Sequence, residues 1–181
     1  MHLKPINTPE LIRLAAGWLA EERNYEWLGF GTGVQNPSPV ALKIMLQKDT
    51  NVLRVFTADD GVPVGIVGLS NLDRNFKTAV IWIVLGDKRY SMKGYAPRAA
   101  EKMLTLGFQE HGLNAISCWA VECNHASLRV IQRMGFRPAG RLRQCHYIDG
   151  HVYDRLLFDL LACEHQEVDQ REIEHQETGN A

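Results

Sequence analysis

Residues 79–99, AVIWIVLGDKRYSMKGYAPRA, form the most informative junction of the sequence. The apolar run 79–85 predicts a strand that is buried on both faces. A short basic loop over residues 86–96 follows, and the next apolar and small positions predict a helix from about Pro97 to His111. A strand, a glycine-containing loop and a helix in this order direct backbone N–H groups and the positive end of the helix dipole to one spot. The stretch therefore predicts an anion site at the end of a central strand.

The loop residues themselves suit a phosphate group. Gly94 and Ala96 are small enough to let a phosphate approach the backbone. Four cationic side chains lie nearby in the sequence: Lys88, Arg89, Lys93 and Arg98. An ordinary solvated loop before a helix is the alternative that spacing alone leaves open. The loop lacks the GxxxxGK[ST] pattern of ATPases and the GxGxxG pattern of dinucleotide-binding enzymes, so neither class has motif support.

The rest of the chain alternates between helical and strand patterns. Capped, proline-led amphipathic helices are predicted over about 8–22 and from Ser38. A helix at about 125–134 ends at Gly135, and Asp149-Gly150 is a strong hairpin signal. Apolar or alternating patterns predict further strands over 52–58, 63–70, 115–121, 136–148 and 151–161.

Length and composition exclude several classes. The 181 residues fit one domain, with 45% hydrophobic and 23% charged residues, and a formal charge of -1 argues against general nucleic-acid binding. The start of the chain lacks a signal-peptide pattern and no apolar run approaches roughly 18 residues, so we expect a cytoplasmic protein with no membrane partner. The four cysteines lack ligand spacing, which predicts reduced thiols and no metal. We expect one domain over 1–163 and a polar, acidic, flexible tail over 164–181.

A second unit that can carry chemistry is residues 122–136, ECNHASLRVIQRMGF. Asn124 ends a predicted strand and can cap the following helix, and Ser127 lies in the first turn of that helix. A plain N-cap is the structural alternative for Asn124. Arg129 and Arg133, four residues apart, are typical of a solvated helix face.

Four motifs, taken in order, resemble those of the Gcn5-related N-acetyltransferases (GNAT), in particular the branch that acetylates the N-termini of ribosomal proteins. The family's G-[KR]-G-[YF]-[AG]-[TS]-E-A loop is similar to residues 92–99, MKGYAPRA, and its L-G-L-N-[RK]-[IL] segment to residues 110–116, EHGLNAI. A closing G-x-x-x-D is similar to Gly150 and Asp154. The family's N-x-x-S-x-x-[VL]-x-x-x-[LM]-G-F motif is matched at Asn124, Ser127, Val130, Met134, Gly135 and Phe136.

The resemblance implies an α/β (α+β) fold: a single GNAT-like domain with a mixed central sheet of about six to seven strands, a splayed parallel strand pair and about four flanking helices. The splayed pair, here 79–85 and 115–121, would hold the pantetheine arm of acetyl-CoA, and the loop amides at 92–96 would bind its pyrophosphate. No metal is implied. The residues implied to bind the co-substrate are Val84, Leu85, Arg89, Ser91, Met92, Lys93, Gly94, Tyr95, Ala96, Asn124, Ser127 and Arg133.

In this family a neutral primary amine would attack the thioester directly, which requires a base, a donor to the carbonyl oxygen and an acid for the leaving thiolate. Many relatives use a tyrosine seven residues after the Asn as the acid, but Ile131 stands there, which leaves Ser127 as the candidate acid. Val80 replaces a central-strand glutamate, so Glu122 and His146 are the candidate bases. Deprotonation through water is the alternative, and for His146 the favoured interpretation is a satisfied strand histidine.

The acceptor site is predicted from aromatic residues that could otherwise be core: Tyr25, Trp27, Phe30 and Trp82. The sequence shows no pronounced acidic groove, which argues against a polyamine. We expect a small primary amine, such as an amino sugar or an amino acid derivative, with a protein N-terminal α-amine as the alternative. An acyl-CoA-binding protein without catalysis is the alternative of another class, and we expect a monomer or a homodimer.

Overall fold

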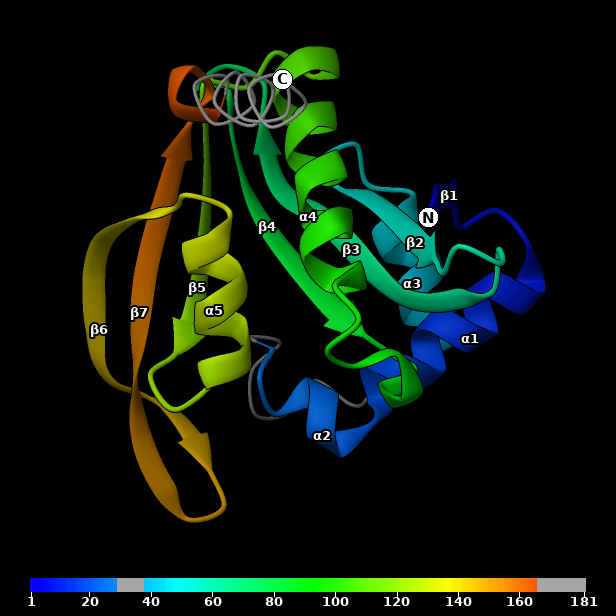
Figure 1. The fold of residues 1–181 in the computed structure, drawn as a ribbon, viewed down its shortest axis with the longest axis horizontal. Helices are drawn as coiled ribbons and strands as arrows, with labels where there is room; N and C mark the ends of the chain where they lie inside the picture. Colours follow the sequence, from blue (N-terminus) through cyan, green and yellow to red (C-terminus); the bar gives the residue numbers. More distant parts are fainter. Residues whose placement is uncertain (29–37, 166–181) are drawn as a thin grey trace, which may run out of the picture.

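The computed structural model describes residues 1–28 and 38–165, which form one mixed sheet with helices on both faces (Figure 1). The strands are β1 (Leu3–Pro5), β2 (Val52–Thr57), β3 (Pro63–Asp73), β4 (Thr78–Leu85), β5 (Ala115–Val121), β6 (Arg137–Ile148) and β7 (His151–Leu161). The 7-stranded sheet has the order β1-β2-β3-β4-β5-β7-β6, and β4 and β5 are its parallel pair. The predicted fold class is confirmed, whereas the short strand β1 was missed.

Three of the α-helices begin at the capping residues that the sequence predicts, whereas the short helix after the first one was not predicted. They are α1 (Pro9–Ala20), α2 (Glu22–Tyr25), α3 (Pro39–Leu46), α4 (Tyr95–Thr105) and α5 (His125–Arg133), with a 3₁₀ turn η1 (Lys88–Tyr90) and a π-helical segment η2 (Leu106–Glu110). Thr8 and Ser38 accept hydrogen bonds from backbone N–H groups in the first turns of α1 and α3. Gly135 has a positive φ directly after α5, as its predicted role at the helix end requires.

Two apolar clusters cover opposite faces of the sheet. One packs α4 and α5 against the sheet and includes Met103, Ile116 and Leu160. The other packs α1 and α3 against the opposite face and includes Leu19 and Leu42. Each face is therefore covered by two helices, which fixes the positions of the loops that enter α4 and α5.

The parallel ladder between β4 and β5 is short. It joins Thr78–Val80 to residues 115–117, whereas β4 pairs with β3 as far as Leu85 and β5 pairs with β7 as far as Val121. Figure 1 shows the two strands diverging from this ladder toward the end of the sheet where α4 and α5 begin. The predicted splayed pair is therefore present.

The divergence also corrects one prediction about β4. The strand is not buried on both faces along its length: Ala79, Ile81 and Val84 are buried, whereas Trp82 and Leu85 are half-buried. The second half of β4 has lost β5 as a neighbour, so its edge is less covered than an all-apolar sequence suggests.

The packed part of the chain extends slightly beyond residue 163. His165 is buried with 3% of its surface exposed, next to the ring of Phe108, and Glu164 pairs with Arg137. The remainder of the predicted tail, 166–181, lies outside the described residues. Within the described residues, none of the helices has the length and apolar character needed to cross a membrane.

Gly86, at the end of β4, lets the sheet approach α1 closely. A Cβ atom on Gly86 would lie 2.1 Å from the ring of Trp18, which is buried in α1. We expect Gly86→Ala to lower the free energy of unfolding by about 1–3 kcal/mol, because the ring must leave its place in a packed interior. Urea denaturation measures this change.

Gly17 provides the matched control. It lies in α1, and a Cβ atom there would meet no heavy atom within 4 Å. Gly17→Ala should leave stability unchanged or raise it by up to about 1 kcal/mol, because alanine favours the helix. Equal destabilisation by both substitutions would contradict the close approach at Gly86.

Candidate active site

The loop between β4 and α4 presents backbone N–H groups at the mouth of the divergence. Gly94 adopts a left-handed conformation with φ of 77° and begins α4 without a side-chain cap. The first N–H groups of the helix, at Tyr95 and Ala96, therefore have no capping side chain. This arrangement matches the predicted anion site, since uncapped N–H groups and the helix dipole both attract negative charge.

The cations of this loop differ in how they are held. Lys93 lies over the ring of Tyr90, 4.9 Å from its centroid. Arg89, a predicted co-substrate ligand, is held by Asp87 through contacts of its Nε and Nη2 atoms at 2.7–3.1 Å. Its charge is therefore partly neutralised, although its side chain is 84% exposed. Lys93 forms no ion pair with a carboxylate among the described residues, and its charge is only the last of the causes that lower the pKa of Asp87, after the contacts of Arg89. Lys93 is therefore the better placed cation for an anion at the loop.

Asp59, which the sequence analysis did not single out, ties the start of α4 to the β2–β3 turn. Its carboxylate accepts hydrogen bonds from the Tyr95 hydroxyl at 3.1 Å and from Arg98 Nη2 at 3.1 Å. The Met1 ammonium lies 2.8 Å away. The pKa of Asp59 is held well below its ordinary value, first by the Met1 ammonium and then by Arg98 and Tyr95. A charged carboxylate thus anchors the first turn of α4.

The second predicted motif lies at the start of α5, beside the diverging end of β5. The Asn124 side chain caps α5, since its Oδ1 atom accepts from Ser127 N at 3.1 Å. Asn124 is therefore the N-cap of α5, and the cap uses its Oδ1 atom rather than its Nδ2 group. Ser127 is half-buried in the first turn, and Arg133 is exposed in the last turn of the same helix.

Other predicted co-substrate residues fall on β4 and on the exposed loop. Val84 belongs to the cluster under α1 and α3, whereas Leu85 packs against the cluster under α4 and α5. Their backbones lie beyond the last residue of β4 that pairs with β5. Ser91 is exposed, and Met92 has a positive φ and is 94% exposed.

Glu122, one of the two candidate bases, directly follows β5 and contacts both strands of the final hairpin. Its Oε1 atom accepts from Asp154 N at 3.0 Å, and its Oε2 atom lies 3.9 Å from Arg141 Nη1. Arg141 also pairs with Asp154 at 3.0 Å. Oε1 of Glu122 is thus fixed by a close hydrogen bond, whereas Oε2 has the longer contact with Arg141.

His146, the other candidate base, has partners at both ring nitrogens. Its Nε2 atom lies 2.6 Å from the carbonyl oxygen of Glu26, and its Nδ1 atom lies 2.9–3.1 Å from the guanidinium of Arg155. A carbonyl can only accept and a guanidinium can only donate, so the ring carries its proton on Nε2. Burial and the charge of Arg155 lower the pKa of His146. The structure thus favours the satisfied strand histidine, because a proton taken up at Nδ1 would break the Arg155 contacts.

Residues 22–28, here called the α2 segment, lie across the open end of the divergence (Figure 1). Asn24 is buried and donates to Trp18 O at 2.8 Å. Lys88, in η1, donates to Asn24 Oδ1 at 2.6 Å and to Leu85 O at 2.8 Å. Burial and the nearby charge of Arg23 lower the pKa of Lys88. A lysine beside the loop after β4 thus fixes one side of the α2 segment.

The four aromatic residues predicted to line the acceptor site differ in exposure and in location. Tyr25 is 40% exposed and Trp27 is half-buried, both in the α2 segment. Trp82 instead packs with the cluster under α1 and α3, and its indole N–H donates to Ser70 Oγ at 2.8 Å. Phe30 lies outside the described residues.

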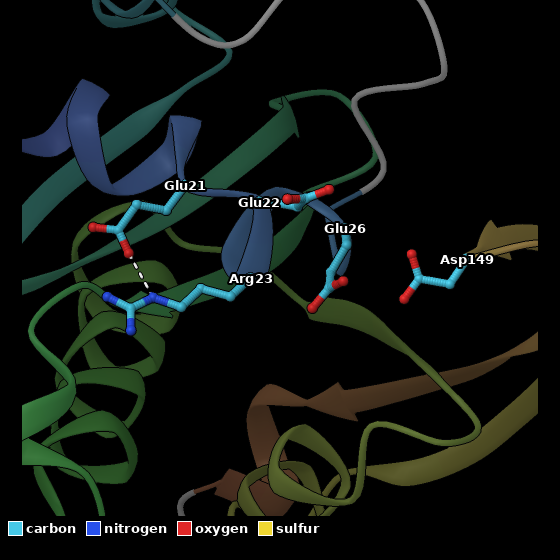
Figure 2. A pocket seen from close by; sticks show the side chains of 5 residues that line it. All are labelled: Glu21, Glu22, Arg23, Glu26 and Asp149. Carbon is cyan, nitrogen blue, oxygen red and sulfur yellow. Dashed lines mark hydrogen bonds and ion pairs between the residues drawn. The ribbon is translucent and has the colours of Figure 1, made fainter.

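An acidic pocket of about 650 Å³ lies between the α2 segment and the tip of the β6–β7 hairpin (Figure 2). Its lining residues are Glu21, Glu22, Arg23, Glu26 and Asp149. Figure 2 shows the Asp149 carboxyl pointing toward Glu26 and the Arg23 side chain paired with Glu21. The prediction that no acidic groove exists was therefore wrong: residues that are far apart in sequence bring their carboxylates together.

The carboxylates of this pocket affect one another. The pKa of Glu26 is raised, first by burial and then by repulsion from Asp149 and Glu22. Within the described residues, no three His, Cys, Asp or Glu side chains are arranged to hold a metal ion. Repulsion among the carboxylates favours any ligand that carries positive charge into the pocket.

The sequence of the chain is similar to a known family and to several named relatives. Residues 1–137 match the sequence model of the family described as "Acetyltransferase (GNAT) domain". The match includes the N-terminal helices, which the four motifs do not cover, and ends before the last hairpin. The chain is also 32% identical over 115 residues to "Putative ribosomal N-acetyltransferase YdaF" of Bacillus subtilis (strain 168), covering 62% of this chain and 61% of that protein.

Two further similarities extend the comparison. "Uncharacterized N-acetyltransferase p20" of Bacillus licheniformis is 25% identical over 122 residues, 67% of this chain and 68% of that one. The crystal structure of spermidine N-acetyltransferase from Vibrio cholerae in complex with CoA and spermine superposes with a TM-score of 0.80 at 16% identity, over 91% of this chain and 97% of that one. At this identity the superposition establishes the shared fold.

The lowered pKa of His146 predicts how acidification affects stability. Above the ordinary histidine value of about 6.5 the ring is neutral in both folded and unfolded chains, so its contribution to stability is complete. Below that value the unfolded chain takes up the proton first, and the contribution is lost as the pH falls through the folded pKa. The free energy of unfolding of the wild type, taken relative to that of His146→Gln, which does not titrate, should fall between pH 8 and pH 5. Urea unfolding of both proteins at each pH measures it.

All other titrating groups occur in both proteins, so their effects cancel in the difference. A difference that stays constant or rises on acidification would mean that His146 is not held neutral by burial and Arg155.

Proposed function

Since its residues 1–137 carry the family's domain, the chain belongs to the GNAT acetyltransferase family, and we propose that it transfers the acetyl group of acetyl-CoA to a primary amine of a small molecule. The observation that carries the proposal is the divergence of β4 and β5 with an uncapped helix start at its mouth. The acceptor is proposed to be an amino sugar or an amino acid derivative that carries additional positive charge.

The residues around the divergence fit acetyl-CoA. The edge of β4 beyond Val80 has no β5 partner, so backbone groups there can pair with the amides of an extended pantetheine arm, as an added strand would. The N–H groups at the start of α4 and the ammonium of Lys93 suit the pyrophosphate. Acetyl-CoA supplies an activated thioester.

The polar groups at the start of α5 are proposed to serve the thiol end. Ser127 is the candidate that protonates the departing thiolate, and Asn124 offers its Nδ2 group as a donor. Glu122 remains the candidate base, through its Oε2 atom or through water. His146 is set aside as a base because both of its ring nitrogens are engaged.

The acidic pocket is proposed as the acceptor entrance. It lies between the α2 segment and the last hairpin, and the carboxylates of Glu22, Glu26 and Asp149 line it. Their mutual repulsion favours a cationic acceptor over a neutral or acidic one. This charge is the main reason to prefer a small charged amine.

A protein N-terminal α-amine is the second candidate acceptor. The printed name of YdaF, a relative with 32% identity, includes ribosomal N-acetyltransferase. An unblocked hexapeptide tested beside an amino sugar, an amino acid amide and a diamine separates the two candidates. An acyl-CoA-binding protein without catalysis predicts co-substrate binding but no turnover with any of these amines.

Binding and transfer are tested with the wild type and Ser127→Ala. Acetyl-CoA or CoA at about 100 times the dissociation constant should add about 2.7 kcal/mol, a rise of a few degrees in Tm, whereas ATP should add none. With an accepted amine, Ser127→Ala should keep this shift and lower kcat about a hundredfold, because it removes the proposed acid. Thermal unfolding and a thiol-release assay measure both quantities.

These two readouts separate the alternatives. An absent shift with both CoA species would exclude the proposed co-substrate site. A shift without thiol release from any amine would favour the non-catalytic protein, and an unchanged kcat in Ser127→Ala would remove Ser127 from the chemistry while leaving the transfer reaction intact.

The pocket is tested by neutralising one carboxylate at a time. Glu26→Gln and Asp149→Asn should each raise the KM for a diamine roughly fivefold, since one charge pair near a surface is worth about 1 kcal/mol. The rise should diminish at high salt. Asparagine suits position 149 because the backbone there has a φ of 48°. Steady-state kinetics at low and high salt provide the measurement.

Glu110→Gln is the charge-matched control. Glu110 is exposed at the end of η2, outside the residues that line the pocket. An equal KM change in this control would indicate a general effect of net charge and would contradict the pocket as the acceptor entrance.

A further inference from the structure

We propose that His146 is a positioning residue: it holds the α2 segment against the β6–β7 hairpin and so sets the width of the acidic pocket. The inference rests on the proposed function in one respect, because the pocket is where the acceptor is proposed to bind. It replaces the sequence-based expectation that His146 acts as a base.

The hydrogen bond from His146 to Glu26 joins the two walls of the pocket. His146 Nε2 donates to the carbonyl oxygen of Glu26 across 120 residues of sequence, at 2.6 Å. Glu26 thus has two roles: its backbone carbonyl accepts the bond from His146, and its side chain lines the pocket. Asp149, on the opposite wall, follows His146 by three residues in the hairpin. Loss of this bond therefore releases one wall from the other.

His146 is itself fixed from two other strands. Arg155, on β7, donates to its Nδ1 atom, and the guanidinium of Arg155 lies 4.1 Å from the ring centroid of Trp119 on β5. The His146 and Trp119 ring centroids are 5.9 Å apart. The imidazole is 7% exposed and is held in the tautomer that donates toward Glu26. The donor is thus oriented before any ligand binds.

The opposite side of the α2 segment has a separate anchor. Lys88 holds Asn24 next to the end of β4, and this contact does not involve the hairpin. When the His146 bond is removed, the segment stays attached near the co-substrate loop and loses its anchor to the hairpin. The expected defect is therefore in the acceptor site, with acetyl-CoA binding preserved.

The test compares His146→Leu with His146→Gln in the full chain. Leucine removes the donor, whereas glutamine keeps one donor and one acceptor for the same partners. Tyr147→Leu is the matched control, because Tyr147 is the next residue of β6 and is 62% exposed. Two readouts are used: hydrogen exchange of the α2-segment amides and steady-state kinetics with the diamine as acceptor.

We expect faster exchange in His146→Leu at the hydrogen-bonded amides of the α2 segment, those of Asn24, Tyr25, Glu26, Trp27 and Leu28. The KM for the diamine should rise about tenfold, while kcat and the KM for acetyl-CoA stay within about twofold. His146→Gln and Tyr147→Leu should behave as the wild type in both measurements.

Two results would overturn the inference. The first is unchanged exchange across the α2 segment in His146→Leu. The second is a fall in kcat without a change in the KM for the diamine, unrescued by glutamine, since this identifies His146 as a proton-transfer group. Hydrogen exchange needs no turnover, so it tests the positioning role even if the wild type acetylates none of the amines. Absence of acetylation would refute the proposed function and leave the positioning role standing.

Discussion

The separation of β4 from β5 is the constraint on which the rest of the site depends. Each strand keeps its outer partner, β3 or β7, so the sheet remains continuous on both sides while an edge opens in its middle. Unpaired backbone groups inside a fold are unfavourable unless a partner is supplied. An extended ligand that bears amide groups supplies one. The same opening places the starts of α4 and α5 on either side of it, where the helix N-termini attract an anionic group and polar side chains reach the reacting end.

The α2 segment connects the two halves of the sheet at the end where β4 and β5 separate. Lys88 fixes Asn24 from the side of β4, and His146 fixes Glu26 from the side of the hairpin. Both anchors use a side-chain donor and a neutral oxygen acceptor, which gives direction without the screening that weakens surface ion pairs. The two halves of the sheet are thereby joined twice, once by the short β4–β5 ladder and once across the open end.

The parts of this architecture that the sequence predicts are those encoded by neighbouring residues. Asp149-Gly150 specifies a hairpin turn and Gly135 a helix end, because both need positive φ, and the motif at Asn124 specifies a cap that three residues suffice to build. The pocket and the anchors depend on contacts across long stretches of chain, such as Glu26 with His146 or Asp59 with Arg98. Charge signs in a sequence do not say which carboxylates will face one another. A histidine between Cys145 and Tyr147 likewise gives no local sign of an arginine partner nine residues later.

The charge of the pocket places a demand on the acceptor. Carboxylates attract an ammonium group but also stabilise its protonated form, and a protonated amine cannot attack a thioester. An acceptor with a single amine would therefore gain affinity from Glu22, Glu26 and Asp149 at the expense of reactivity. An acceptor with a second cationic group avoids this conflict, because the second group can remain among the carboxylates while the reacting amine extends to the divergence of β4 and β5. In the proposed reaction the acidic residues then contribute to binding, and deprotonation is assigned to the region of Glu122 and Ser127 rather than to the pocket itself.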